Sequence, residues 1–288
     1  NANPAIAINK NGLCDVCQKY GENFDIKTLE KELEFLGSLK SNTGKRDVIV
    51  GLSGGKDSTA TLYRVKEMGF SPLAFSLDTG YYPKSIFSRA KEMADKLGVD
   101  YEKIDIKKYA RESDIRSFIE TAELYDEEVN DYLKDKFRKL YLEGRKHYSI
   151  KCNHTLPFVR TCQLCRRLVI RAYYEEAIKH EVQVVILGIN EWAGLSQDIK
   201  SNKTVFSAIR KLQAFNERPP VYTGHLPFIL QPKIFDTQEI LKKIGWDIPE
   251  GESFIESNSN SCLFALAAEE KARTLLGFHP DTTRLARE

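Results

Sequence analysis

One six-residue segment combines residue types that bind and transfer phosphate groups: Ser53-Gly54-Gly55-Lys56-Asp57-Ser58. Consecutive glycines let successive backbone N–H groups face one point, and a helix starting there adds the positive end of its dipole. Lys56 can offset negative charge that develops on a phosphate leaving group. Asp57 is a ligand for Mg²⁺, directly or through water. We therefore predict three catalytic residues, Lys56, Asp57 and Ser58, and three cofactor-binding residues, Ser53, Gly54 and Gly55.

The flanking sequence places this segment between a strand and a helix. Residues 47–52 form a short apolar run that reaches the glycines, which is typical of a buried parallel strand. A helix is expected over residues 57–68, ended by Gly69. The segment is not a Walker A loop, because Asp57 follows the lysine and Val50 stands where the first glycine would be.

Further strands and helices alternate along the chain. We expect strands at 72–78, 101–106 and 182–188, and helices at 26–40, 85–97 and 162–180. This alternation predicts an α/β fold, an open parallel sheet with helices on both faces.

The remaining segments are expected to surround that core. We predict a helical insertion at 108–148, a polar loop at 202–220, a fifth strand at 226–231, and helices at 237–244 and from 261 onward. The predicted division is a head with a C-x-x-C pair and a helix (1–40), a core (41–235) and a C-terminal helical segment (236–288).

Bulk composition restricts the class of protein. The chain has 288 residues, 42% hydrophobic and 29% charged, which allows a sizeable core. Its net charge of +2, from 43 basic and 41 acidic residues, neither requires nor excludes a nucleic acid partner. Basic residues do cluster at 103–116 and 160–171. No apolar run reaches the roughly 18 residues that span a bilayer, so we expect a soluble, cytoplasmic protein without a membrane partner.

The glycine segment resembles the S-G-G-x-D-S loop of the PP-loop ATP pyrophosphatases, and the resemblance covers roughly residues 46–106 and 160–190. It implies the adenine nucleotide α-hydrolase fold and an enzyme that uses ATP and Mg²⁺. In this family a substrate oxygen attacks the α-phosphate, pyrophosphate leaves, and a nitrogen or sulfur nucleophile then displaces AMP. The resemblance also implies that Asp78 and Thr79 lie near the adenosine, and Gly188 and Asn190 near the phosphates. Asp78 could instead cap a helix or turn.

Six cysteines provide a second set of candidate functional residues, at positions 14, 17, 152, 162, 165 and 262. Two C-x-x-C pairs in an intracellular protein point to metal or redox chemistry. Superfamily members that install sulfur in tRNA carry a C-x-x-C before a helix and one later cysteine, which together hold an iron–sulfur cluster. Cys162 and Cys165, followed by two arginines, resemble that motif, and Cys262 is the candidate third ligand.

Other roles for the cysteines stay open. Cys14, Cys17, Cys162 and Cys165 could together bind one structural Zn²⁺ ion. Alternatively, the first pair could join Cys152 and His154 in a zinc site and leave the second pair for a cluster. The thiols could also be redox-active or metal-free, and Cys262 could be a small buried residue.

Three functions are compatible with these residues. The leading hypothesis is an enzyme that adenylates its substrate and transfers sulfur, with tRNA as the acceptor and a second protein as sulfur donor. Residues 11–17 also resemble the start of the N-acetyl-sugar amidotransferases, which implies a nucleotide-linked sugar and ammonia from a glutaminase partner. The third hypothesis is a non-catalytic nucleotide-binding protein with structural zinc.

Overall fold

A computed structural model describes residues 7–40, 46–146, 159, 161–197, 203–212, 218–248, 250 and 262–278. These residues form two compact units that interleave along the chain. The sheet unit comprises the described residues of 23–105 and 170–261. The helical unit comprises those of 1–22, 106–169 and 262–288.

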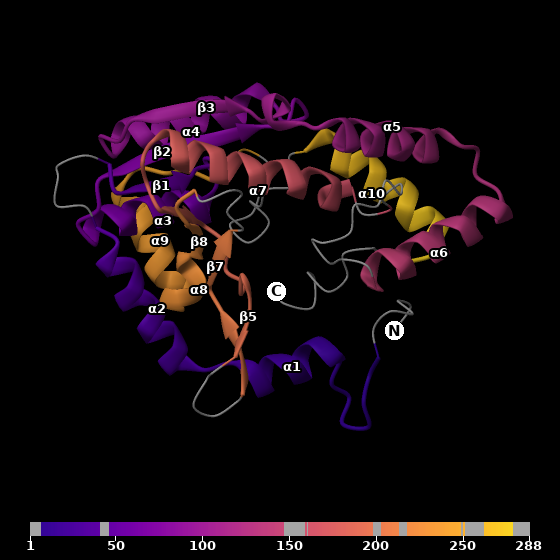
Figure 1. Cartoon of the computed structure of the whole chain (residues 1–288), viewed down its shortest axis with the longest axis horizontal. Helices are drawn as coiled ribbons and strands as arrows, with labels where there is room; N and C mark the ends of the chain where they lie inside the picture. Colours follow the sequence, from indigo (N-terminus) through magenta and orange to yellow (C-terminus); the bar gives the residue numbers. More distant parts are fainter. Residues whose placement is uncertain are drawn as a thin grey trace. The chain divides into compact units, whose positions relative to one another are not determined.

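The sheet unit is built on a six-stranded sheet with the order β3-β2-β1-β4-β8-β7 (Figure 1). Its strands are β1 (Val48–Gly51), β2 (Pro72–Asp78), β3 (Tyr101–Asp105), β4 (Val184–Leu187), β7 (Ile209–Leu212) and β8 (Val221–His225). Neighbouring strands pair in parallel except at the edge, where β7 runs antiparallel to β8. A separate antiparallel pair is formed by β5 (Gly194–Gln197) and β6 (Thr204–Ser207). The predicted α/β fold with an open parallel sheet is confirmed, and the antiparallel edge strand β7 is the one departure from it within the described six-stranded sheet.

Helices cover both faces of this sheet. The helices of this unit are α2 (Ile26–Ser38), α3 (Lys56–Glu67), α4 (Lys84–Lys96), α8 (Leu226–Leu230), the second half of α7 (Thr161–Lys179), and α9 (Ile234–Lys243), which packs on α3. On one face, Ala74 of β2 lies in a buried cluster with Leu62 of α3 and Ala90 of α4. The next residue, Phe75, points to the opposite face because side chains alternate along a strand. There its ring contacts Tyr173 of α7 edge to face, with centroids 5.7 Å apart.

The helical unit has a core of its own. Its elements are α1 (Asp15–Asn23), the 3₁₀ turn η1 (Ile106–Tyr109), α5 (Glu112–Asp126), α6 (Asp131–Lys146), the first half of α7, and α10 (Leu263–Leu276). Asn23, the last residue of α1, is assigned to the sheet unit. Helices α6 and α10 pack together through a cluster that includes Leu133, Phe137, Ala272 and Leu275. The predicted helical insertion at 108–148 is confirmed as α5 and α6.

Two sequence-based predictions near the sheet edge are wrong. Residues 202–220 were expected to form a loop, but 204–207 and 209–212 are strands β6 and β7. Both strands are only four residues long, and each carries an exposed polar residue, Thr204 in β6 and Lys211 in β7, so this stretch has no clear strand pattern in the sequence. Residues 226–231 were expected to form the fifth strand, but they begin with helix α8, and the strand is β8, just before it. Pro227, in the first turn of α8, favours a helix start and cannot donate a ladder hydrogen bond.

The predicted domain boundaries near residues 40 and 235 stay predictions. Each of the two compact units is made of segments that are not consecutive in the chain, so neither unit is a single stretch of sequence. Helix α2 packs with β6 and α8 inside the sheet unit. Among the described helices, none is both long enough and apolar enough to cross a membrane.

Candidate functional site

The glycine segment links the end of β1 to the start of α3. Gly54 has a φ of +73°, a left-handed conformation that favours glycine, and a Cβ there would lie 2.9 Å from the backbone nitrogen of Ala90. Gly55 is the N-cap of α3, which begins at Lys56. The first N–H groups of a helix have no acceptor within it. The loop therefore offers backbone donors and a helix dipole at one point, as a phosphate site requires.

Ser58 closes the loop on itself. Its hydroxyl donates to the carbonyl of Gly55 (3.1 Å) and accepts from the backbone N–H of Ser53 (3.1 Å). The hydroxyl groups of Ser53 and Ser58 also lie 3.0 Å apart. Ser58 therefore holds the shape of the loop in addition to any contact with a ligand.

Lys56 and Asp57 form an ion pair at the start of the helix. Their Nζ and Oδ2 atoms are 3.4 Å apart, and the side chain of Lys56 is only 11% exposed. Burial raises the pKa of the Asp57 carboxyl, and the charge and hydrogen bond of Lys56 act in the opposite direction. A buried cation beside a partly exposed carboxylate suits a site that binds phosphate together with Mg²⁺.

A cavity of about 90 Å³ opens beside this pair. It is lined by Lys56, Asp57, Ala60, Thr61, Arg64, Asn190, Pro227, Pro232, Ile234 and Thr237. Ligand pockets usually measure about 300–1,000 Å³, so this cavity encloses only part of a nucleotide.

The end of β4 meets the start of α3. A Cβ at Gly188 would lie 2.6 Å from Cα of Ser58 and 2.7 Å from its nitrogen, so only glycine fits there. Asn190, two residues later, is exposed and lines the cavity with Lys56 and Asp57. The structure thus brings Gly188 and Asn190 to the glycine loop, although 130 residues or more separate them in sequence.

At the end of β2, Asp78 has protein partners. Its Oδ2 lies 2.7 Å from Nζ of Lys103, and its Oδ1 accepts the backbone N–H of Gly80 at 2.7 Å. Asp78 therefore caps the turn that follows β2, which is the alternative role considered from the sequence. Thr79 is buried, and its hydroxyl accepts the N–H of Tyr81 at 3.4 Å. The adenosine-binding role of Asp78 and Thr79 stays a prediction.

Trp246 contacts the loop and was missed by sequence reasoning. Its Nε1–H donates to the carbonyl of Gly54 at 2.9 Å, and its ring is almost fully buried. The guanidinium of Arg89 lies over that ring, 4.6 Å from its centroid, and also donates to the carbonyl of Asp247. No local pattern marks Trp246, because it lies nearly two hundred residues from the loop in the sequence.

The cysteines that the structure describes lie in the helical unit. Cys14 Sγ accepts the backbone N–H of Cys17 at 3.3 Å, which is the local turn of a C-x-x-C pair. Cys165 and Cys262 are half-buried thiols. The side chain of Cys162 and residues 152 and 154 lie outside the described residues. Among the side chains that are described, no three cysteines come within ligand distance of one another, so the cluster and zinc sites stay predictions.

A larger cavity, about 350 Å³, contains none of the predicted site residues. It is lined by Thr28, Lys31, Glu32, Phe35, Ser207, Ile209, Lys211 and Tyr222. Burial raises the pKa of the Glu32 carboxyl, which accepts hydrogen bonds from the Ser207 hydroxyl and, at 2.9 Å, from the N–H of Ala208. Glu32 therefore joins α2 to the corner between β6 and β7.

Known proteins are similar to part of this chain. A family model described as NAD synthase matches residues 28–148. The tRNA-specific 2-thiouridylase MnmA 1 of Thermoanaerobacter pseudethanolicus is 29% identical over 141 residues, 44% of this chain and 33% of that protein. The NH(3)-dependent NAD(+) synthetase of Archaeoglobus fulgidus is 34% identical over 93 residues, 31% of this chain and 37% of that protein. The chain thus spans about a third of the length of these relatives.

Solved structures resemble this chain at lower sequence identity than the relatives above. The NMN synthetase from Francisella tularensis matches with a TM-score of 0.38 and 14% identity, covering 88% of this chain and 94% of that chain. The NH3-dependent NAD synthetase from Campylobacter jejuni matches with a TM-score of 0.29 and 17% identity, covering 58% of each chain. The sequence relatives are consistent with the structure, in which a glycine loop links β1 to α3 at the end of a parallel strand. These matches confirm, over the part of the chain that they cover, the resemblance to the PP-loop ATP pyrophosphatase superfamily that the sequence predicted.

Proposed function

We propose that this protein uses ATP to adenylate an oxygen atom of its substrate and releases pyrophosphate. The observation that carries the proposal is the loop at the start of α3, where Lys56 is buried 3.4 Å from Asp57 beside a cavity. A protein that only binds a nucleotide needs neither a buried lysine nor a neighbouring carboxylate at this position.

In the proposed reaction the substrate oxygen attacks the α-phosphorus of ATP. The bond from that phosphorus to the bridging oxygen breaks, and pyrophosphate leaves with the electron pair. Lys56 and the N–H groups of the loop stabilise the negative charge that grows on the leaving group. Asp57 would hold Mg²⁺, which neutralises charge on the phosphates. Gly188 lets the end of β4 approach the loop, and Asn190 faces the same cavity.

A second nucleophile then displaces AMP from the activated carbon. We propose sulfur as that nucleophile and tRNA as the acceptor, supported by the thiouridylase relatives and by the two C-x-x-C pairs. Because the described thiols do not assemble a cluster site, no step of this reaction is assigned to an iron–sulfur cluster.

Transfer of ammonia is the second candidate. The NAD synthase family model and the NH(3)-dependent synthetase relatives favour it, as does the resemblance of residues 11–17 to the amidotransferases. This candidate requires a glutaminase partner or ammonia itself, and a small nucleotide-linked substrate.

The first test measures AMP and pyrophosphate released from ATP and Mg²⁺ in the presence of unmodified tRNA or of nucleotide-linked sugars. Lys56→Ala is expected to lower the rate by about 10²-fold or more, because a preorganised charge at the leaving group is lost. Lys91→Ala, which removes an exposed ion pair with Asp95 on α4, is the matched control and should keep full activity. An active Lys56→Ala variant would refute the assigned site.

The identity of the nucleophile is tested separately. Isotope-labelled sulfide and labelled ammonia are supplied in parallel, and the product is examined for the label. Iron, acid-labile sulfide and zinc are measured on protein purified without oxygen, with Cys162→Ala as the comparison. Iron with sulfide that disappears in Cys162→Ala supports sulfur transfer, whereas zinc without iron that disappears in Cys162→Ala favours the nitrogen candidate. Nucleotide binding without AMP release under any condition would favour a non-catalytic binding protein.

A further inference from the structure

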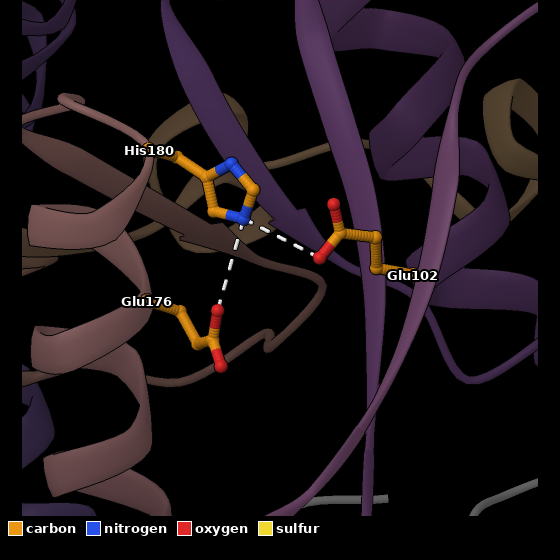
Figure 2. A group of neighbouring side chains, drawn as sticks. All are labelled: Glu102, Glu176 and His180. Carbon is orange, nitrogen blue, oxygen red and sulfur yellow. Dashed lines mark ion pairs between the residues drawn. The ribbon is translucent and has the colours of Figure 1, made fainter.

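Three side chains that could bind a metal ion meet between the sheet and α7 (Figure 2). Glu102 lies near the start of β3, where it is in register with Phe75 of β2. Side chains in register across parallel strands point to the same face, and Phe75 faces α7. Glu176 belongs to α7 and His180 immediately follows it, and their spacing of four residues puts both on one side of the helix.

The distances suit a metal ion. His180 Nε2 lies 3.4 Å from Glu102 Oε2 and 3.7 Å from Glu176 Oε2. One ligand atom from each of the three residues lies within 4.8 Å of the other two. Ligands about 2.0–2.1 Å from a tetrahedral Zn²⁺ are roughly 3.4 Å apart, so small side-chain shifts would complete the geometry.

Burial and hydrogen bonding also indicate a ligand. The side chain of Glu176 is 0% exposed, and that of His180 is 12% exposed. His180 Nε2 is buried and has no hydrogen-bond partner among the residues that the structure describes, although it points toward two carboxylates (Figure 2). Buried polar atoms without a partner are uncommon, and a metal ion held by the two carboxylates would also satisfy this nitrogen.

One cation already approaches these carboxylates. Nζ of Lys179 lies 3.1 Å from Glu176 Oε2 and 3.4 Å from Glu102 Oε2. Its side chain is 55% exposed, so the ammonium group can turn away into solvent when a metal ion binds. Lys179 would then act as a competitor of the metal ion.

We propose that Glu102, Glu176 and His180 form a binding site for a divalent transition-metal ion of the zinc class. One imidazole and two carboxylates suit Zn²⁺ or Co²⁺, and three protein ligands leave a position for water. Glu102 lies in the first half of β3, whereas the glycine loop follows the end of β1, so the site is separate from the nucleotide site. The bound ion would tie α7 to the sheet.

The probe is Co²⁺ alone, titrated into the full chain and followed by visible absorption. Co²⁺ bound by nitrogen and oxygen shows ligand-field bands without the intense near-ultraviolet band of cobalt–thiolate bonds, so binding here is distinguished from binding at the cysteine pairs. We expect one Co²⁺ per chain of the nitrogen and oxygen type. Cobalt bound only through thiolates would overturn the proposal.

Variants assign the ligands. Glu102→Gln and His180→Asn each should weaken this Co²⁺ binding by about 10-fold or more. Glu92→Gln, which removes an exposed carboxylate paired with Lys96, is the matched control and should bind as the wild type does. Lys179→Met should bind Co²⁺ about 2- to 5-fold more tightly, because an exposed competing ion pair is removed. Tighter Co²⁺ binding in Lys179→Met tests the proposal even if a ligand variant does not fold. Unchanged Co²⁺ binding in Lys179→Met and in the folded ligand variants would refute it.

Discussion

At the scale of single residues, the glycine loop depends on groups outside its motif. Lys56 and Asp57 provide charge, but the carbonyl of Gly54 is held by Trp246, a residue from the other end of the sheet unit's sequence. Trp246 also packs with Ala60, Met93 and Leu241, so it connects the loop to α3, α4 and α9. A tryptophan that donates to the loop backbone should therefore contribute to its preorganisation.

We predict that Trp246→Phe weakens ATP binding while the protein stays folded. The substitution keeps an aromatic ring in the cluster and removes only the N–H donor, which contributes about 0.5–1.5 kcal/mol, or roughly 2- to 10-fold in Kd. Titration calorimetry with ATP and Mg²⁺ measures the effect. Trp192→Phe is the control, because Trp192 packs in a different hydrophobic cluster, where it stacks on Phe206 at a centroid distance of 4.0 Å. Equal Kd values for the two variants would contradict the role of Trp246.

At the scale of elements, the site depends on how closely β4 approaches α3. Val185 and Ile186 of β4 pair with Ile49 and Val50 of β1, so both strands end beside the start of α3. The lack of a side chain at Gly188 makes this approach possible.

Gly188→Ala is expected to destabilise the protein by about 1–3 kcal/mol and to abolish tight ATP binding. The added methyl group would meet the backbone of Ser58 at 2.6 Å, so the strand end or the helix start must shift. Urea unfolding and ATP titration measure the two effects. Gly194→Ala should change neither, because no atom of the described residues lies within 4 Å of a Cβ at that position. A Gly188→Ala variant with wild-type stability and affinity would show that the two elements are less closely packed.

At the scale of the whole molecule, the chain forms two units with separate cores. The helical unit is built around Leu124, Leu133 and Phe137, whereas the sheet unit is built around residues such as Leu36, Val50 and Leu62. Each core is made of segments that are distant in sequence.

We predict that Leu133→Ala weakens the helical unit more than the sheet unit. Leu133 is fully buried, and truncating a buried leucine costs about 2–5 kcal/mol. Hydrogen exchange should become faster in α5, α6 and α10, with a smaller change in β1, β2 and β4. Leu142→Ala on α6, where the leucine is 39% exposed, is the control and should have little effect. An equal acceleration in both units would mean that they unfold as one.

The sequence by itself determined the elements whose signals are local. The apolar run at 48–51, the glycines after it and the helical spacing that follows predicted the loop and α3 because each pattern lies within a few residues. The alternation of strands and helices predicted the parallel sheet for the same reason, and the insertion was recognisable as two charged helices. These signals also located Lys56, Asp57 and Ser58 as candidate residues.

Only the tertiary structure decided which distant residues meet. It paired β4 with β1, which brings Gly188 to Ser58, and it brought Trp246 to Gly54 and His180 to Glu102. It also turned β7 antiparallel at the sheet edge and made residues 226–230 a helix. Such contacts join residues far apart in the chain, and they depend on the packing of whole elements. A local sequence pattern does not determine how distant elements pack against one another.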